Sequence, residues 1–277
     1  MQKPLTISID GVDYPFHLNG IQKVQNSALK ILRGITYPLV DNIDVKVVLD
    51  LGANIGAASV FFALSYRDAS IYAFEPATIN YKLLEKNSSY FANIHVFQKG
   101  IHEINGKGKL FVNSHNPERN SLVGNWAQSN TFEEIELMRL DKFLLENSIK
   151  KIDILKIDTE GCELQILQTI LNFIPEIEVI YLEYHNKAQK NDILTIINKT
   201  HDLISDNLTG VANLKLCNYD LEKYTNYKDI VVGETTVLRA NKTIEKKDIQ
   251  KLKNAGIEEI KVWSNEMGEI IATKKNK

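Results

Sequence analysis

Apolar and polar positions alternate along the chain in two rhythms, which predict strands and helices in turn. Short apolar runs of strand length are separated by stretches with the helical spacing of apolar residues. This alternation is typical of a parallel, doubly wound sheet covered by helices on both faces. We therefore predict an α/β fold with a mostly parallel sheet and an antiparallel edge strand. The strands are expected at 45–51, 71–75, 93–97, 152–157 and 178–183, and the helices at 57–65, 78–90, 163–173 and 192–198.

The regions on either side of this pattern do not continue the regular alternation of strands and helices. Residues 5–18 alternate as a hairpin turning near Asp10-Gly11, and a helical pattern follows until Gly34. Weaker strand signals at 212–217 and 235–240 predict a closing edge hairpin, and a strand at 109–112 is expected to pair near 93–97. The tail predicts a helix at 248–253 and a hairpin turning around Asn265–Gly268. We expect three parts, 1–44 as hairpin and helix, 45–240 as core, and 241–277 as helix plus hairpin.

Composition narrows the classes of function. The 277 residues carry a net charge of −2 and no polybasic run, so nucleic acid is not the expected partner. Cys162 and Cys217 lie far apart without metal spacing, which predicts neither a disulfide scaffold nor a zinc site. We find no apolar leader and no run of membrane-spanning length. We expect a cytoplasmic protein, which could also act at the surface of a membrane.

The stretch VVLDLGANIG at 47–56 predicts a strand followed by a tight turn into a helix. A dinucleotide-binding turn has a glycine in the middle, where the backbone approaches the pyrophosphate, and here that position is Asn54. The turn therefore favours a nucleoside-like ligand without a pyrophosphate, such as S-adenosylmethionine. Gly52 would let the backbone pass the amino-acid portion of that ligand, and Asp50 would engage its ammonium. The alternative is a tight turn in which Asn54 caps the helix.

Glu75 and Pro76 follow the second expected strand. A carboxylate at this place can accept hydrogen bonds from both hydroxyls of a ribose. Pro76 cannot continue the strand ladder and is expected to leave Glu75 at an exposed tip. The alternative is an ordinary surface glutamate before a turn.

The motif KIDTEGCE at 156–163 gathers carboxylates after the fourth core strand. Asp158 and Glu160 are candidates for a general base toward a hydroxyl, and Lys156 would tune their charge or bind substrate. The alternative is a capped helix start, which we prefer for Glu163 because of the helix dipole. His185 is a further candidate base, although a lone histidine is more often structural. Two adjacent carboxylates do not make a Mg²⁺ site, and we predict no metal.

These motifs together resemble the FkbM family of S-adenosylmethionine-dependent methyltransferases. The resemblance covers residues 45–185, about half of the chain, and depends on the order of several motifs rather than on any one of them. The motifs are DLGANIG at 50–56, FEP at 74–76, NSL at 120–122, RLDKFL at 139–144, LKIDTEGCE at 155–163 and IYLEYH at 180–185.

The resemblance implies a class I methyltransferase fold, which is Rossmann-like, with S-adenosylmethionine as cofactor. It implies O-methylation of a hydroxyl on a sugar, a glycolipid or another small metabolite. Asp158 and Glu160 carry over as active-site residues, and Lys156 and His185 stay candidates beside them. The expected cofactor contacts are Asp50, Gly52, Ala53, Asn54, Gly56, Glu75, Pro76, Ser121 and Asp158.

Three other classes of protein are alternatives to this family. An NAD-dependent oxidoreductase shares the strand-turn-helix-Glu pattern, although Asn54 argues against it. A nucleic-acid methyltransferase on the same fold commonly has a proline- and aromatic-rich turn where this chain has IDTEG. A non-catalytic nucleoside-binding module is the third alternative. The expected partner is a small-molecule, glycan or glycolipid acceptor, and a homo-oligomer is compatible with the C-terminal pattern.

Overall fold

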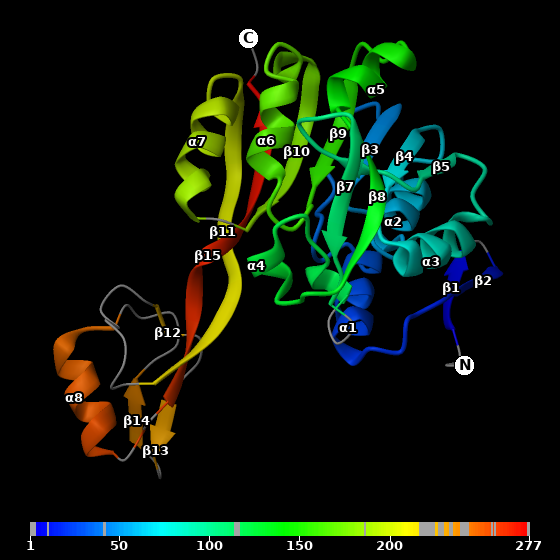
Figure 1. The fold of residues 1–277 in the computed structure, drawn as a ribbon. Coiled ribbons are helices and arrows are strands. Elements are labelled where there is room, and N and C mark those ends of the chain that lie inside the picture. The colour runs from blue at the N-terminus through cyan, green and yellow to red at the C-terminus, as the bar shows by residue number, and fades with distance from the viewer. Residues whose placement is uncertain are drawn as a thin grey trace.

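A central sheet of eight strands organises the protein (Figure 1). The computed structural model describes residues 4–9, 11–40, 43–113, 117–185, 187–215, 225–226, 230–232, 235–238, 244–255, 257 and 259–275. The strands of the sheet are β3 (Val47–Leu51), β4 (Ser70–Phe74), β5 (Ile94–Phe97), β9 (Ile152–Ile157), β10 (Ile177–Tyr184), β11 (His201–Lys215), β12 (Thr225–Asn226) and β15 (Glu259–Lys274).

The order of these strands is β11-β15-β10-β9-β3-β4-β5, with β12 paired to β15. The strands from β10 to β5 are parallel, and the chain reverses its direction of winding between β3 and β9. β15 runs antiparallel to both β10 and β11, one strand in from the edge. The predicted doubly wound, mostly parallel, Rossmann-like sheet with an antiparallel strand at its edge is therefore confirmed. Ligands bind such sheets beyond the carboxyl ends of the strands at the point of reversal.

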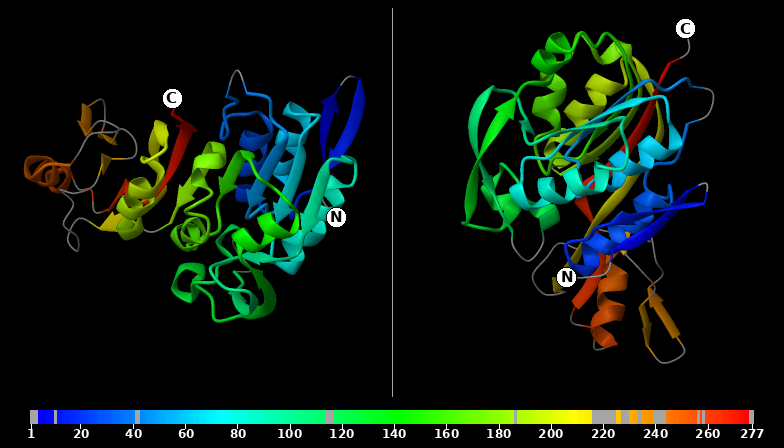
Figure 2. Two further views of the ribbon diagram at one scale, coloured as in Figure 1. Left: turned by 90° about the horizontal axis from the view of Figure 1, so that it is seen from above. Right: turned by 90° about the vertical axis from the view of Figure 1, so that its right-hand side faces the viewer.

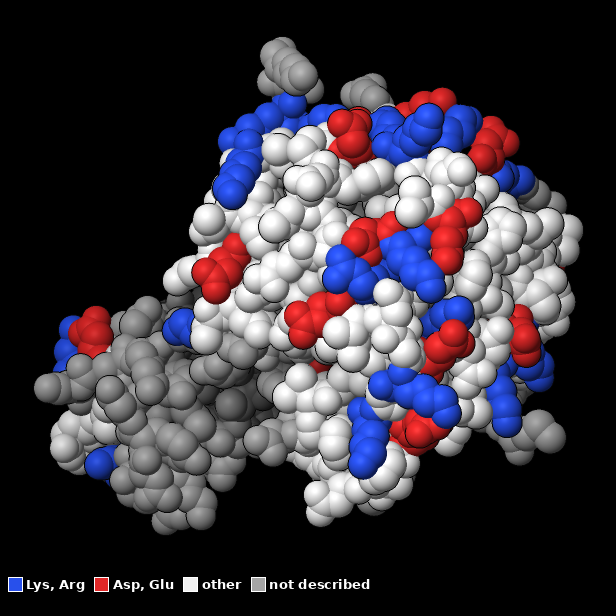
Figure 3. Space-filling model, turned by 45° about the horizontal axis from the view of Figure 1, so that its top comes forward, with Lys and Arg blue, Asp and Glu red and all other residues white. Residues whose placement is uncertain are grey.

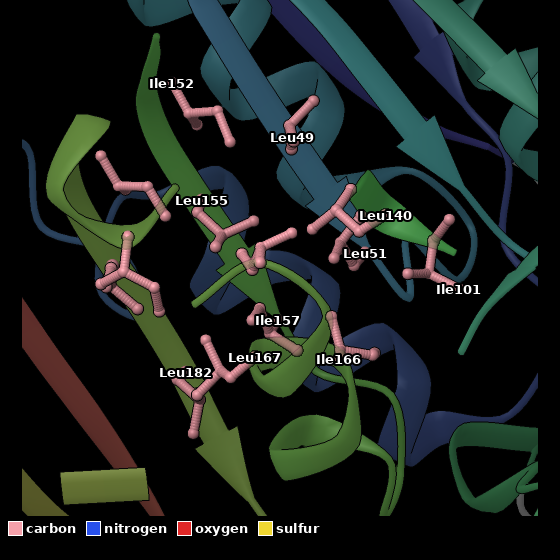
Figure 4. Close-up of a cluster of buried hydrophobic side chains, with 14 of the residues drawn as sticks. Leu49, Leu51, Ile101, Leu140, Ile152, Leu155, Ile157, Ile166, Leu167 and Leu182 are labelled. Carbon is pink, nitrogen blue, oxygen red and sulfur yellow. The ribbon is translucent and has the colours of Figure 1, made fainter. Parts of the chain in front are cut away.

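Both faces of the sheet are apolar and covered by helices. Successive strand residues point to opposite faces, so Val48 joins the core under α1–α3 while Leu49 and Leu51 join the core under α5–α7. Figure 4 shows the second of these cores, with Leu155, Ile157 and Leu182 pointing the same way. The helices are α1 (Gln22–Leu32), α2 (Ala57–Ser65) and α3 (Thr78–Ser88) on one face, and α5 (Leu140–Glu146), α6 (Glu163–Thr169) and α7 (Lys187–Ile197) on the other.

Smaller sheets flank the core. The predicted N-terminal hairpin is confirmed as β1 and β2. The strand expected to pair near 93–97 instead pairs with residues 132–138. That strand was not predicted, because three of its seven residues are glutamates, which are depleted in strands. The elements are β1 (Leu5–Ile9), β2 (Val12–Phe16), β6 (Gly100–Ile101), β7 (Gly106–Phe111), η1 (Pro117–Arg119), α4 (Gly124–Ala127), β8 (Phe132–Met138), η2 (Ile174–Glu176), β13 (Ile230–Val232), β14 (Thr235–Leu238) and α8 (Lys246–Asn254).

The C-terminal predictions need two corrections. The expected closing hairpin is wrong, because β14 pairs with β13 while β11 pairs with β15; part of that prediction, residues 216–217 and 239–240, lies outside the described residues. The expected tail hairpin is also wrong, because 259–274 form one continuous strand. Residues 259–264 pair with β11, and pairing resumes at Gly268 with both β10 and β11, so the strand passes through the turn signal around Asn265–Gly268. The division at residue 240 stays a prediction about folding units, although β15 belongs to the central sheet.

The β11–β15 ribbon runs out of the sheet toward α8 (Figures 1 and 2). Basic and acidic side chains lie side by side on the face drawn in Figure 3. Ion pairs of the molecule include Lys99–Glu136 at 3.2 Å and Arg139–Asp141 at 2.6 Å. Among the residues described, none of the helices combines the length and the apolar character that a bilayer crossing requires.

Candidate active site

The turn after β3 has an unusual backbone. Gly52, Asn54 and Gly56 all have positive φ, of 79°, 50° and 91°. The amides of Gly52 and Ala53 donate to the Phe74 carbonyl of β4 at 3.0 and 2.8 Å, which fixes the turn against the neighbouring strand. α2 begins after Gly56 without a side-chain cap, so the alternative in which Asn54 caps this helix is wrong.

Gly52 is required by the neighbouring chain. A Cβ at this position would lie 1.8 Å from the carbonyl oxygen of Asp158. The backbones after β3 and β9 therefore touch where the sheet reverses, and the Asp158 amide donates to the Leu51 carbonyl at 3.1 Å. Chain packing therefore demands this glycine, and the predicted passage of the backbone past the amino-acid portion of a ligand stays a prediction.

Asp50 and Lys156 form a buried pair beneath this contact. Lys156 Nζ lies 3.0 Å from Asp50 Oδ1 and donates to the Gly52 carbonyl at 2.6 Å. Ser59 Oγ donates to the other Asp50 oxygen at 2.6 Å. Burial lowers the pKa of Lys156, but the carboxylates of Asp50, Asp158 and Glu75 together more than offset this and the pKa is raised. Asp50 and Lys156 are 0% and 3% exposed, and their pair joins the two strands. Their predicted contacts with a ligand ammonium and with substrate stay predictions.

Glu75 and Asn54 form what we call the nucleoside corner. Glu75 is only 5% exposed, which contradicts both the expected exposed tip and the alternative of a surface glutamate. Its two oxygens accept from the amides of Asn54 and Ala77, each at 2.9 Å. Burial raises the pKa of Glu75 to about 7, although these amides oppose the shift.

The nucleoside corner keeps hydrogen-bonding capacity for a ligand. Asn54 Oδ1 is buried, and no described residue bonds to it. A carboxylate oxygen has more than one lone pair, so each Glu75 oxygen can accept another donor. A pair of hydroxyls such as those of a ribose would satisfy these groups, so the residues fit the predicted cofactor. Ala53 belongs to the core near α2, and Pro76 is partly buried after β4.

A second group lies at the carboxyl ends of β9 and β10, and we call it the carboxylate–imidazole cluster. His185 is at its centre and is 3% exposed. Its Nε2 lies 3.4 Å from Glu160 Oε2, 3.8 Å from Asp158 Oδ1 and 3.9 Å from Glu183 Oε1. Its Nδ1 lies 3.0 Å from Glu163 Oε1. The members are Asp158, Glu160, Glu163, Glu183 and His185.

Glu163 has a larger role than the sequence indicated. It is fully buried, and its Oε1 accepts from the amides of Thr159 and Gly161 at 3.2 and 3.0 Å. Burial would raise its pKa, but His185 and the Gly161 amide lower it below the usual value. The preferred explanation by the helix dipole alone is thus incomplete, because Glu163 also orients His185. Its burial was the missing signal, and the sequence does not show it.

Protonation differs among the cluster residues. Burial lowers the pKa of His185, but Glu160 and Glu163 raise it well above the ordinary value. The raised pKa opposes the predicted role of this ring as a base. Burial raises the pKa of Asp158 to about 6, while Lys156 and His185 act in the opposite direction.

Ser121 supports the acidic turn. It is fully buried, its hydroxyl donates to the Glu160 carbonyl, and its oxygen accepts from the Val123 amide at 3.0 Å. The expected contact of Ser121 with cofactor or acceptor stays a prediction. Glu160 needs this support because it has φ of 57°, in the left-handed region that costs a non-glycine residue energy.

A pocket opens next to the cluster at Glu183. Thr36 and Tyr37 from the segment after α1 line it together with Ile271 of β15. No sequence motif indicated that residues 36–37 reach this place. The N-terminal segment and the C-terminal strand thus both contribute to the wall beside the candidate active site.

Several curated relatives of this chain are methyltransferases by name. Three curated relatives are methyltransferase sdnD of Sordaria araneosa, hexuronic acid methyltransferase AglP of Haloferax volcanii and 2-O-methyltransferase NoeI of Sinorhizobium fredii. The first is 28% identical over 44% of this chain and 60% of its own length. The second is 20% identical over 72% of this chain and 82% of its own length. The third is 25% identical over 61% of this chain and 74% of its own length. The chain thus spans about three fifths of the first relative. The model of the methyltransferase FkbM domain matches residues 50–221, and the chain belongs to this family of methyltransferases.

Proposed function

We propose that this protein is an S-adenosylmethionine-dependent methyltransferase that acts on a hydroxyl of a sugar, a glycolipid or a similar small metabolite. One observation carries the proposal: the nucleoside corner and the carboxylate–imidazole cluster lie at the carboxyl ends of adjoining strands, joined where Gly52 meets Asp158. Membership of the FkbM family supports the reaction class. The printed names of two relatives, a hexuronic acid methyltransferase and a 2-O-methyltransferase, support a hydroxylated acceptor.

The nucleoside corner would hold the cofactor. Asn54 Oδ1 and the free lone pairs of Glu75 would accept the ribose hydroxyls, in place of water. Gly56, at the start of α2, brings the helix N-terminus to the same corner. When bound, S-adenosylmethionine supplies a methyl group activated by a sulfonium. The task left to the protein is to place the acceptor oxygen and remove its proton.

The carboxylate–imidazole cluster would handle that proton. Asp158, with its pKa raised to about 6, is half-ionised or more near neutral pH and suits a general base. Glu160 lies on the same turn and contacts the same imidazole nitrogen, so it is the second candidate. His185, held by Glu163, keeps these carboxylates in place rather than acting as the base. General-base catalysis of this kind contributes about 10²–10⁴-fold.

The pocket at Glu183 is the proposed site for one polar group of the acceptor, because it has room for little more than a water molecule. It opens beside the cluster and is lined by Thr36 and Tyr37 together with apolar side chains. Action on a small-molecule, glycan or glycolipid acceptor, in the cytoplasm or at a membrane surface, stays part of the proposal. An oligomeric state is not needed for it.

The experiment that tests the proposal compares ligands and then acceptors. Calorimetry should show binding of S-adenosylhomocysteine and none of NAD, which would separate the methyltransferase from the oxidoreductase alternative. Transfer of a labelled methyl group to a panel of uronic acids, glycolipids and short RNAs should label the first two classes. NAD binding alone would overturn the cofactor, labelling of RNA alone would overturn the acceptor, and cofactor binding without transfer to any acceptor would favour a non-catalytic module.

A further inference from the structure

Three side chains in the carboxylate–imidazole cluster converge from two neighbouring strands. One ligand atom from each of Asp158, Glu183 and His185 lies within 4.8 Å of the others. β9 and β10 are parallel and in register, with Ile157 opposite Leu182, so residues just beyond these positions meet at one edge of the sheet. Spacing along the chain gave no hint of this, because the three residues belong to two motifs.

The orientation of the His185 ring is fixed by a buried partner. Glu163 Oε1 accepts from the amides of Thr159 and Gly161, so it acts as an acceptor toward His185 Nδ1 as well, at 3.0 Å. Nδ1 therefore donates, and Nε2 is turned toward the three other carboxylates. A histidine that binds a metal almost always donates its other ring nitrogen to a carboxylate or a carbonyl in this manner.

The charges in the cluster favour a further cation. Four carboxylates surround one imidazole, and the nearby Lys156 is already bound to Asp50 at 3.0 Å, against 3.8 Å to Asp158. Glu163 is fully buried, and its second oxygen, Oε2, has no hydrogen-bond partner among the described residues. Like charges gathered in a buried place are costly unless a cation compensates them.

We propose that Asp158, Glu183 and His185 bind a divalent metal ion, with Glu160 beside it and Glu163 holding the histidine ring. Two carboxylates and one imidazole suit a first-row ion such as Mn²⁺. The side chains of Asp158 and Glu183 are 26% and 24% exposed, so the ion can enter from solvent and keep open positions. Glu183 also lines the pocket, which places the open side toward an acceptor.

A consequence for catalysis follows, and it rests on the proposed function. A divalent cation here would hold an acceptor hydroxyl against the pocket and lower the pKa of that hydroxyl. With Asp158 bound to the ion, Glu160 rather than Asp158 would be the general base, and the hydroxyl proton would leave to its carboxylate, 3.4 Å from His185 Nε2 in this structure. The oxygen would then bond to the methyl carbon while the carbon–sulfur bond breaks and the sulfur leaves as a thioether.

The test measures metal binding without any methyl donor or acceptor. The full chain is dialysed against a chelator and titrated with Mn²⁺, followed by calorimetry and by the electron paramagnetic resonance signal of free Mn²⁺. We expect saturable binding of one ion per chain. Glu183→Gln and His185→Gln should each weaken it about 10–100-fold or more.

The control is Glu134→Gln, which removes an exposed carboxylate of β8 that pairs with Lys107. This variant should bind Mn²⁺ like the parent. Circular dichroism checks that each variant folds, and Glu183→Gln keeps the side-chain shape if His185→Gln does not fold. Absence of saturable binding, or equal binding by Glu183→Gln and the parent, would overturn the proposal. Mn²⁺ binding in a chain that transfers no methyl group would leave the metal site standing and count against the methyltransferase alone.

Discussion

The nucleoside corner and the carboxylate–imidazole cluster lie on adjoining strands but are built in opposite ways. In the corner, the Glu75 carboxylate is fixed by two backbone amides, and the charged group has no charged partner within the turn. In the cluster, His185 is surrounded by carboxylates at 3.0–3.9 Å, and the pKa values of Asp158, Glu163 and His185 are shifted by neighbouring charges.

This difference indicates a division of labour. Backbone donors hold a fixed geometry and suit the recognition of a ligand that always has the same hydroxyls. A set of interacting ionisable groups can take up or release a proton or a cation at small cost, which suits chemistry. The contact of Gly52 with Asp158 keeps the two regions at a fixed separation. Changes to the nucleoside corner, to the carboxylate–imidazole cluster or to the contact between them should have the following effects, in order of decreasing size.

Glu160→Gln should lower turnover about 10²–10⁴-fold while leaving S-adenosylhomocysteine binding nearly unchanged, because it alters the cluster and not the corner. Labelled-methyl transfer and calorimetry measure the two effects separately. Glu134→Gln, an exposed carboxylate away from the site, serves as the control. Full activity of Glu160→Gln and of Asp158→Asn together would reduce the acidic turn to a structural role.

Gly52→Ala should destabilise the fold by about 3 kcal/mol or more, because its Cβ would meet the Asp158 carbonyl at 1.8 Å. Gly11→Ala is a matched control: Gly11 has the same φ of 79°, and a Cβ there meets nothing within 4 Å. The control should cost only the backbone strain, about 1–2 kcal/mol. Urea unfolding of both variants measures the difference, and equal losses would contradict the packing explanation.

The free energy of unfolding should fall as pH rises from about 4.5 to about 7, because Glu75 has a pKa near 4.5 unfolded and about 7 folded. Between these values the folded state binds the additional proton, so stability is full below the window and is lost through it. A shift of this size corresponds to about 3 kcal/mol. Glu75→Gln should flatten this limb in urea unfolding at several pH values.

Glu163 supplies the contrast for the pH experiment. Its pKa is lowered in the folded state, so its contribution is present above its unfolded value of 4.5 and is lost as pH falls through the folded pKa. Glu163→Gln should therefore change the acid limb, while Glu75→Gln changes the limb near neutral pH. Identical profiles for the two variants would contradict the assignment of the limbs to the two regions.

Glu75→Ala should weaken S-adenosylhomocysteine binding at least tenfold, about 1.4 kcal/mol or more, because the ribose hydroxyls lose their acceptor. Calorimetry measures this affinity. The same change also frees the amides of Asn54 and Ala77, so circular dichroism must confirm the fold. An unchanged affinity in a folded variant would remove the ribose assignment and leave Glu75 as a turn residue.

Predictions from the sequence succeeded where a feature depends on neighbours along the chain and failed where it depends on contacts between distant segments. The strand 152–157 and the helix 57–65 were predicted with their observed bounds, because apolar runs and turn residues act locally. Asn54 and Glu75 were placed together through the order of strands in such sheets. The burial of Ser121 was not predicted, because it depends on a contact with the Glu160 carbonyl, 39 residues away in the chain.

The sequence by itself determined the alternation of strands and helices, the turn at 52–56 and the chemistry of KIDTEGCE, since these depend on neighbours along the chain. Only the tertiary structure decided that β15 enters the sheet, that Asp50 and Lys156 are buried as a pair, and that Glu163 orients His185. Each of these contacts joins segments far apart in the chain. Their free energy comes from burial and charge pairing in the folded molecule, and no local pattern records it.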